Sequence, residues 1–317
     1  MKAEIEQGAA LLRKLESAVL STFVGEARVV QLALIGLAGS LHVLIEDIPG
    51  VGKTTLALAL ARLSGLSFSR IQCTPDLLPA DVLGLSVWDS QKRDFVFKPG
   101  PVLANFVLAD ELNRSSPRTQ AAFLQAMQEG AISVDGKIIP LPQPFFMIAT
   151  QNPQNFVGTF PLPEAELDRF GLCFSLGYPD PDAEQLILER NDLANPVDAL
   201  EPITNPEAIV QLRHLVRRIG IHESVRRYIC EIIRATRTMA EIRLGASPRA
   251  GIFLQQASRA AALYAGRDFV IPEDVVSVAV PVLAHRLVLG AQSRLSGKHS
   301  AELIDSVLRA VRKPTGL

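Results

Sequence analysis

A lysine and a threonine follow a glycine-rich turn between an apolar segment and a helical one. The turn reads Glu46-Asp47-Ile48-Pro49-Gly50-Val51-Gly52-Lys53-Thr54-Thr55. Gly50 and Gly52 let backbone N–H groups turn inward around an anion, and the helix that follows points its partial positive end at the same place. Lys53 is a point charge that can reach β- and γ-phosphates, and the Thr54 hydroxyl can bind Mg²⁺. Strand, glycine turn, Lys-Thr and helix in this order predict a phosphate-binding loop.

The loop departs from the general pattern at its first glycine. In G-x-x-x-x-G-K-[ST] that glycine would fall on residue 47, which here is Asp47. Aspartate tolerates a left-handed backbone better than most residues, so we expect the turn to form. A carboxylate near phosphates could nonetheless weaken nucleotide affinity. The alternative is a plain strand–turn–helix in which Gly-Lys-Thr occurs by chance.

Two acids end the next strongly apolar segment. Residues 105–111 predict a buried strand that finishes with Asp110 and Glu111. In a nucleotide-binding sheet such a strand lies beside the phosphate-loop strand, at the carboxyl edge where ligands bind. Asp110 would hold Mg²⁺, and Glu111 would orient and polarise the attacking water. Residues 145–153 predict another buried strand, which would bring Thr150 and Asn152 to the same edge. Surface acids at a strand end are the alternative.

Other candidate residues lie at helix boundaries. Val24 and Gly25 stand in a break between two helical segments shortly before the phosphate loop, where an adenine base could lodge. A simple helix connector explains them nearly as well. Arg169 ends a short predicted helix within residues 160–170, and we expect it to be exposed at a domain edge.

Arg249 stands in the first turn of a predicted helix. Ser247 suits the N-cap of that helix and Pro248 its first position. A cation in the first turn opposes the helix dipole, so Arg249 hints at an anionic partner. An ordinary first-turn arginine is the alternative.

Composition describes an ordinary globular protein. Of 317 residues, 48% are hydrophobic and 21% charged, and the formal net charge is −1. No global basic field therefore draws the chain to nucleic acid or anionic lipid. Three cysteines (Cys73, Cys173 and Cys230) are far apart and without C-x-x-C spacing, as in reduced cytosolic proteins. There is no apolar signal segment, and the apolar region 29–45 falls short of the roughly 20 residues of a membrane span. We expect a cytoplasmic location.

The pattern changes along the chain. Apolar strands alternate with helical segments up to about residue 184, whereas from about 185 onward only helical spacing is found and no convincing strand. We therefore predict an α/β domain over 1–184 and a helical domain over 185–317. Two hairpins are also predicted, one within 82–100 and one at the Asp135-Gly136 turn of 131–140. Trp88 in the first hairpin would contact a partner or cover local core.

Five motifs occur in order and closely resemble the MoxR family of AAA+ ATPases over about residues 20–290. They are the phosphate loop 46–54, Leu108-Ala109-Asp110-Glu111-Leu112-Asn113-Arg114, Ala149-Thr150-Gln151-Asn152-Pro153, the segment 162–170, and Gly245-Ala246-Ser247-Pro248-Arg249-Ala250. The resemblance implies an AAA+ P-loop core with a parallel sheet, an all-α lid domain, and a homo-oligomeric, usually hexameric, ring with ATP and Mg²⁺ bound between subunits.

The resemblance also implies a role for each matching residue. Walker A, as cofactor-binding residues, comprises Pro49, Gly50, Val51, Gly52, Lys53, Thr54 and Thr55, with Val24 and Gly25 near the base. Thr54 and Asp110 would be the metal ligands. Glu111 completes Walker B, Asn152 matches sensor 1, Arg169 the arginine finger and Arg249 sensor 2. Asp47 looks like a variation that this family tolerates.

The activity implied is ATP hydrolysis that drives chaperone-like remodelling or maturation of protein complexes, often with a partner that contains a von Willebrand factor A (VWA) domain. The insertions at 76–100 and 131–140 would face the ring's pore or a client protein. Three alternatives stay open from the sequence. They are a nucleic-acid-acting AAA+ motor such as a helicase or translocase, a nucleotide-bound scaffold that scarcely hydrolyses, and a magnesium-chelatase-type subunit.

Overall fold

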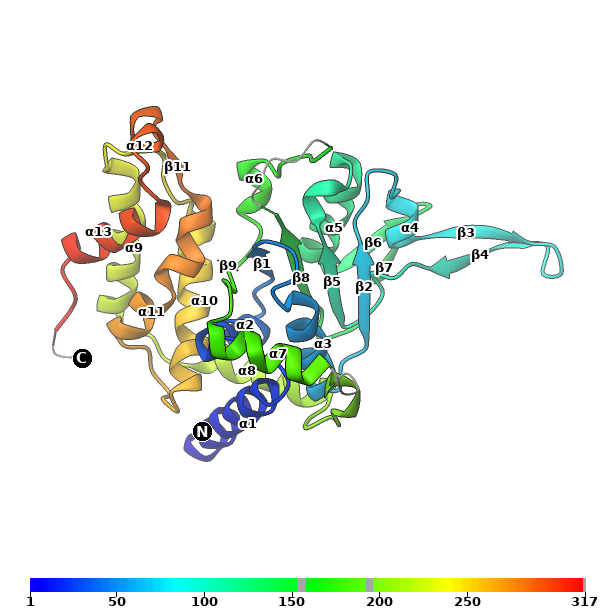
Figure 1. The fold of residues 1–317 in the computed structure, drawn as a ribbon, viewed down its shortest axis with the longest axis horizontal. Coiled ribbons are helices and arrows are strands. Elements are labelled where there is room, and N and C mark those ends of the chain that lie inside the picture. Colours follow the sequence, from blue (N-terminus) through cyan, green and yellow to red (C-terminus); the bar gives the residue numbers. More distant parts are fainter. Residues whose placement is uncertain (153–157, 192–195, 316–317) are drawn as a thin grey trace.

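The computed structural model describes residues 1–152, 158–191 and 196–315. An α/β body occupies the centre, and a mainly helical part formed by the C-terminal third lies beside it (Figure 1). The strands of the central sheet are β1 (Val43–Glu46), β2 (Phe68–Gln72), β5 (Phe106–Asp110), β8 (Phe146–Gln151) and β9 (Leu172–Phe174). This arrangement confirms the predicted fold class.

All five strands of this sheet run parallel, in the order β2-β5-β8-β1-β9. The inner strands are apolar along their length because helices cover both faces of such a sheet. Every residue of β5 is buried, for example. Register places Ile45 of β1 opposite Thr150 on one side and Phe174 on the other. The residues that follow β1, β5, β8 and β9 therefore meet at one carboxyl edge.

Helices of the body surround this sheet. They are α1 (Lys2–Leu20), α2 (Ala27–Gly39), α3 (Lys53–Leu63), α4 (Pro79–Leu83), α5 (Pro117–Glu129), α6 (Glu164–Leu167) and α7 (Pro181–Asn191), with 3₁₀ turns η1 (Leu112–Arg114) and η2 (Pro196–Ala199). Helix α2 is apolar almost all round, which is typical of a buried helix, and its residues from Leu32 to Gly39 are buried. Its position behind β1 and β9 fixes the strand that carries the phosphate loop.

Both predicted hairpins are present. They are β3 (Gly84–Asp89) with β4 (Asp94–Pro99), and β6 (Ala131–Val134) with β7 (Lys137–Pro140). Asp135 and Gly136 both have positive φ, at 50° and 74°, as a two-residue primed turn requires. The hairpin β3–β4 projects from the body (Figure 1). Trp88 and Phe95 stack edge to face there and are 54% and 64% exposed, so Trp88 does not cover the core.

The C-terminal part consists mainly of helices, as predicted. They are α8 (Pro206–Arg218), α9 (Glu223–Thr238), α10 (Pro248–Tyr264), α11 (Pro272–Leu283), α12 (Ala291–Leu295) and α13 (Ser300–Ala310), with the 3₁₀ turn η3 (Ala284–Arg286). Helix α8 packs on α1 and α2, and the Arg213 guanidinium donates to the carbonyls of Leu37 and Phe145 at 3.0 and 3.1 Å. Helices α9, α10, α11 and α13 pack on one another.

The expectation of no strand after residue 185 is wrong. Strands β10 (Ile242–Leu244) and β11 (Val288–Leu289) form a small antiparallel pair in the helical part. Each strand is too short to show an alternation of apolar and polar residues. The pairing, which buries Ile242 and Leu289, is decided by helices that bring distant segments together. Within the described ranges, no helix combines the length and the hydropathy that crossing a membrane demands.

Candidate active site

The phosphate loop connects β1 to α3, as the sequence predicts. Gly50 and Gly52 both have φ of 90°, a backbone conformation that side chains other than glycine's rarely allow. Helix α3 then begins at Lys53, with Gly52 as its N-cap. The Lys53 ammonium donates to the carbonyls of Asp47 and Ile48 at 2.8 and 2.9 Å. The loop therefore forms a backbone nest with a lysine folded back over it.

Lys53 lies close to the acids at the end of β5. Burial lowers the pKa of Lys53, and the nearby charges of Asp47, Asp110 and Glu111 oppose that change. Lys53, Asp110 and Glu111 are thus close together near the carboxyl edge of the sheet.

Thr150 fixes the two acids relative to each other. Its hydroxyl donates to an oxygen of Asp110 at 2.7 Å and accepts from the backbone N–H of Glu111 at 2.8 Å. Thr150 is fully buried, and Glu111 adopts a left-handed backbone with φ of 57°. The prediction that Thr150 emerges beside Asp110 is confirmed. Glu111 is turned out of the strand direction, with its side chain partly exposed.

Three polar residues around these acids were not singled out from the sequence. Arg70 on β2 pairs with Asp110 at 2.6 Å, whereas Arg114 pairs with Glu111 at 2.8 Å. Gln72 also donates to Glu111, at 3.2 Å. The only sequence signal is that Arg70 and Gln72 alternate with apolar residues, which places them on one face of β2 next to β5. Both arginines offset negative charge at the edge.

The donor set at this edge suits Mg²⁺. Asp110 offers carboxylate oxygen and Thr54 a hydroxyl beside Lys53, and Mg²⁺ prefers hard oxygen ligands. Within the described residues, no group of three or more His, Cys, Asp or Glu side chains could hold a metal ion alone. Mg²⁺ in nucleotide sites keeps several waters and uses one or two protein ligands plus phosphates, so this small donor set fits the ion.

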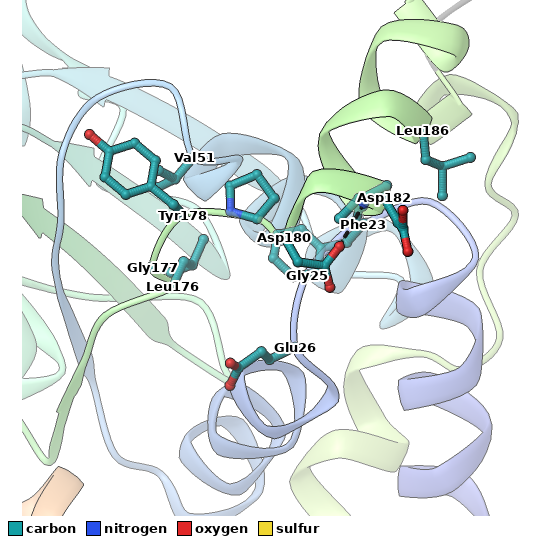
Figure 2. Close-up of a pocket in the computed structure, with 13 residues that line it drawn as sticks. Phe23, Gly25, Glu26, Val51, Leu176, Gly177, Tyr178, Asp180, Asp182 and Leu186 are labelled. Carbon is teal, nitrogen blue, oxygen red and sulfur yellow. Dashed lines mark hydrogen bonds between the residues drawn. The ribbon is translucent and has the colours of Figure 1, made fainter.

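A pocket of about 470 Å³ adjoins the phosphate loop (Figure 2). One wall is the connector between α1 and α2, which contains Val24 and Gly25, and Val51 of the loop contributes to it. The opposite wall is formed by residues 176–186, which sequence reasoning missed. The volume is within the range usual for small-molecule sites, roughly 300–1,000 Å³. Packing explains why residue 25 is a glycine, because a Cβ there would lie 2.6 Å from the Phe23 ring.

Asp47 is oriented differently from the sequence hypothesis. One carboxylate oxygen accepts from the N–H of Ile48 at 2.8 Å. The other accepts from the Ser175 hydroxyl and from the N–H groups of Leu176 and Gly177, at 2.8, 2.7 and 2.9 Å. Burial would raise the pKa of Asp47, but these hydrogen bonds outweigh it and lower the pKa. The carboxylate is thus satisfied by the segment after β9 and is not free beside the phosphates.

Asn152 follows β8 at the same edge. Its backbone carbonyl accepts a hydrogen bond from the side-chain amide of Asn113 at 3.1 Å. Pro153, which completes the predicted motif, lies outside the described residues.

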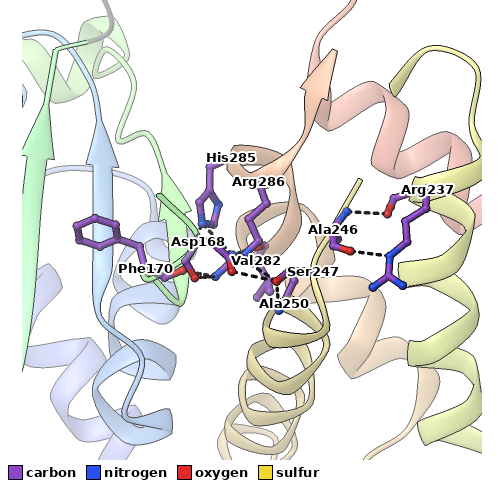
Figure 3. Close-up of polar contacts among 10 residues, drawn as sticks. Asp168, Phe170, Arg237, Ala246, Ser247, Ala250, Val282, His285 and Arg286 are labelled. Carbon is purple, nitrogen blue, oxygen red and sulfur yellow. Dashed lines mark hydrogen bonds and ion pairs between the residues drawn. The ribbon is translucent and has the colours of Figure 1, made fainter. Parts of the chain in front are cut away.

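Asp168, Ser247 and Arg286 form a second cluster, at the junction between the body and the helical part (Figure 3). Arg169 adjoins Asp168 in the sequence, and Arg249 follows Ser247 by two positions. Asp168 precedes Arg169, and its carboxylate accepts from the hydroxyl of Ser247 at 2.9 Å. Ser247 is the N-cap of α10, as predicted, and also accepts from the Ala250 N–H. Arg249 is in the first turn of this helix. Both arginines are partly exposed.

Arg286, which sequence reasoning missed, holds this junction from the other side. Its side chain is 1% exposed and pairs with Asp168 at 3.0 Å. It also donates to the carbonyls of Val282 and Phe170. Burial lowers the pKa of Arg286 to about 10, against the favourable charge of Asp168, so the side chain remains charged at neutral pH. Three segments far apart in sequence therefore meet at one carboxylate.

Comparisons with known proteins agree with this architecture. Residues 42–172 match the model described as "ATPase family associated with various cellular activities (AAA)", and residues 234–307 match an AAA lid domain. The Chaperone MoxR1 of Mycobacterium tuberculosis is 39% identical over 319 residues, covering 96% of this chain and 84% of that protein. YeaC of Bacillus subtilis is 42% identical over 304 residues, covering 96% and 95%.

A solved structure is similar over nearly the whole chain. It is a Cytophaga hutchinsonii protein proposed to be an ATPase, with a TM-score of 0.91, 34% identity, and coverage of 99% of this chain and 98% of that one. The family models, the relatives and the shared fold lead to the same conclusion. This chain belongs to the MoxR family of AAA+ ATPases.

Proposed function

We propose that this protein binds ATP with Mg²⁺ and hydrolyses it. One observation carries the proposal: the buried Thr150 hydroxyl joins Asp110 to the backbone of Glu111, beside the ammonium of Lys53. A cation for the phosphates, a metal ligand and a candidate base are thereby held in one place. Phosphoryl transfer needs little covalent chemistry from the protein, so positioning and charge supply most of its rate.

In this proposal the phosphates occupy the backbone nest of residues 49–55, where Lys53 exchanges its carbonyl partners for phosphate oxygens. The adenine occupies the pocket that Val24 and Gly25 line. Thr54 and Asp110 hold Mg²⁺, which neutralises charge that develops on the phosphates. An ammonium bound by two carbonyls can make this exchange at small cost, because phosphate oxygens are stronger, charged acceptors.

Glu111 orients the attacking water and accepts its proton, and Asn152 helps to position that water. The left-handed backbone of Glu111 turns the carboxylate away from the sheet, and Gln72 and Arg114 both donate to one of its oxygens. These contacts hold the side chain near the edge where the γ-phosphate would lie. Proton transfer by a positioned group typically contributes ~10²–10⁴ in rate.

We further propose that the active site is completed across subunits of a homo-oligomer, a hexameric ring. Arg169 would reach the γ-phosphate bound by the neighbouring subunit, and such an arginine is worth roughly 10³–10⁵ in rate in related reactions. Arg249 would respond to the phosphates and set the position of the lid. Asp168 immediately precedes Arg169, and its carboxylate accepts a hydrogen bond from the N-cap residue of α10, the helix that carries Arg249. This contact supports the roles proposed for the two arginines.

The energy of hydrolysis would drive remodelling or maturation of a client protein complex in the cytoplasm, together with a VWA-domain partner. The relative named Chaperone MoxR1 supports a chaperone role. The exposed aromatic residues Trp88 and Phe95 on hairpin β3–β4 offer an apolar surface for the client or partner. In this proposal residues 1–184 bind the nucleotide and residues 185–317 form the lid that moves.

The substitution Glu111→Gln tests hydrolysis directly. We expect the rate of ATP hydrolysis to fall by ~10²–10⁴, because the base is lost, while ATP still binds. Glu129→Gln, at an exposed position at the end of α5, is the matched control and should hydrolyse ATP like the parent. A Glu111→Gln protein that turns over as fast as the parent would contradict the proposal and favour a nucleotide-bound scaffold.

A further inference from the structure

Asp47 connects three parts of the site. Its backbone N–H donates to the Gln151 carbonyl at the end of β8, at 3.1 Å. Its carbonyl accepts from Lys53, and its carboxylate accepts from residues 175–177 after β9. The residue is 7% exposed. A glycine at this position would keep the first two contacts and lose all those of the carboxylate.

The segment that the carboxylate holds is one wall of the pocket beside the phosphate loop. Leu176 and Gly177 both donate to the same oxygen of Asp47, and both line the pocket (Figure 2). Gly177 has φ of 72°, which turns the chain sharply toward Tyr178, another lining residue. The position of this wall therefore depends on residue 47, which is itself part of the phosphate loop.

The opposite wall is fixed independently. Residues 23–25 follow helix α1, and Phe23 is buried against the Gly52 and Gly25 backbone. Among the described residues that line the pocket, Leu176 and Gly177 of the wall after β9 are bonded to the Asp47 carboxylate. We propose that Asp47 is a positioning residue that sets this wall against the phosphate loop and so determines how strongly the protein binds the base of a nucleotide. This inference rests on the proposed function, in which that pocket receives the adenine.

The arrangement requires a carboxylate. Both of its oxygens accept hydrogen bonds, one from Ile48 and the other from three donors after β9. An asparagine could turn its amide oxygen to Leu176 and Gly177, but its NH₂ would then face the Ile48 N–H, which is also a donor. Hydrogen bonds to a charged acceptor are about twice as strong as neutral ones, so the exchange weakens the wall.

The test compares two probes that share the phosphate site and differ in the base. Affinities for ATP and for inorganic tripolyphosphate, each with Mg²⁺, are measured by calorimetry for the parent and Asp47→Asn. We expect Asp47→Asn to weaken ATP binding about tenfold, the factor that corresponds to about 1.4 kcal/mol. Its affinity for tripolyphosphate should stay within about twofold of the parent, since the carbonyls of Asp47 and Ile48 and the loop backbone are unchanged.

Two further variants separate this role from general damage to the fold. Ser175→Ala removes one donor to the same carboxylate without altering the phosphate loop, and should weaken ATP binding in the same selective way, by a smaller factor. Glu129→Gln changes an exposed carboxylate at the end of α5 and should leave both affinities as in the parent. Thermal unfolding of every variant shows whether it is folded.

The outcomes are distinguishable. Equal losses for ATP and tripolyphosphate in folded Asp47→Asn, or no loss for either, would overturn the inference and leave the proposed ATPase function standing. A parent protein that binds tripolyphosphate but gains nothing from the adenosine of ATP would also overturn it. A parent that binds neither probe would overturn the proposed function, and the inference with it.

Discussion

The Ser247 hydroxyl lies 2.9 Å from a carboxylate oxygen of Asp168, although the two residues belong to opposite sides of the junction between the body and the lid. Asp168 immediately precedes Arg169, and Ser247 caps the helix in which Arg249 stands. A displacement of the lid that moves Arg249 would therefore be transmitted to the segment that carries Arg169. In a ring, this would connect the nucleotide state of one subunit to the active site of the next.

The first prediction concerns the stability of this junction. Asp168→Ala leaves the guanidinium of Arg286, which is 1% exposed, without its charge partner. Removing one member of such a buried pair typically costs about 3–5 kcal/mol. Because Asp168 is partly exposed, we expect the free energy of unfolding to fall by ~3 kcal/mol, at the lower end of that range. Urea unfolding of the variant measures the loss.

A double-mutant cycle with Arg286→Met provides the control. If the two side chains stabilise each other, the double variant should lose less than the sum of the single variants, by ~1–3 kcal/mol. Strictly additive losses would show that Asp168 and Arg286 act independently and would contradict the role of this pair.

The second prediction concerns Thr150. Thr150→Val keeps the shape of the side chain but removes the hydroxyl that bonds to Asp110 and to the Glu111 N–H. We expect ATP hydrolysis to fall by ~10–100-fold, since small displacements of catalytic groups have effects of this size. Steady-state hydrolysis and ATP binding are measured together, and binding should change little.

Thr150→Ser is the matched control, because it restores the hydroxyl in a slightly smaller side chain. Its rate should lie near that of the parent. Loss of activity in Thr150→Ser equal to that in Thr150→Val would mean that packing at this buried position, rather than the hydrogen bonds, is what matters.

Local patterns made much of the fold predictable. The phosphate loop, the Asp135-Gly136 turn and helix α8 depend on residues that are neighbours in the sequence, so their signals lie within one short window. The acids at the end of β5 were predictable because a parallel sheet brings strand ends to one edge. Thr150, 40 residues beyond Asp110, could be placed by the same argument.

Contacts between distant segments were not predictable. Asp168 and Arg286 are 118 residues apart, and nothing in either local sequence names the other. For Asp47 the sequence gives a carboxylate in a phosphate loop, but its direction is decided by donors 128–130 residues later. Strands β10 and β11 are too short for a periodic signal. In each case a tertiary arrangement, rather than a local preference, determines the structure.

The third prediction concerns pH. Burial, with the charge of Arg213 adding to it, lowers the pKa of His42 from 6.5 to about 4, and the neutral ring accepts the Met147 N–H at 3.0 Å. The folded state therefore binds the proton less readily than the unfolded state. The contribution of the neutral His42 side chain to stability is complete above pH 6.5 and is lost as the pH falls toward 4.

Thermal unfolding of the parent and of His42→Asn across this range measures the effect. Asparagine can accept the same N–H but does not titrate. The titration of carboxylates and of the other histidines therefore affects the stability of both proteins alike. The stability of the parent relative to the variant should decline between pH 6.5 and 4. A constant difference would contradict the assignment.

The fourth prediction concerns the projecting hairpin. Trp88 and Phe95 are exposed by more than half and pack on each other across the hairpin, so replacing both with serine should lower the free energy of unfolding by only about 1 kcal/mol. We expect the hydrolysis rate without a client to stay near that of the parent, because the hairpin projects from the body, away from the phosphate loop (Figure 1). A loss of basal hydrolysis would show that the hairpin serves assembly or catalysis.

The central claim is that each active site combines Glu111 of one subunit with Arg169 of its neighbour. The most direct measurement is the rate of ATP hydrolysis in a mixture of Glu111→Gln and Arg169→Ala proteins, each nearly inactive alone. In mixed rings an Arg169→Ala subunit keeps its own Glu111 and receives an intact arginine from its neighbour. We predict that activity appears on mixing and rises with protein concentration. Arg227→Ala, altered at an exposed arginine of α9, is the control. Its mixture with Glu111→Gln should have the activity expected of parent diluted by inactive protein. A mixture of Glu111→Gln and Arg169→Ala that stays as inactive as its two components, or an Arg169→Ala protein as active as the parent, would contradict the central claim.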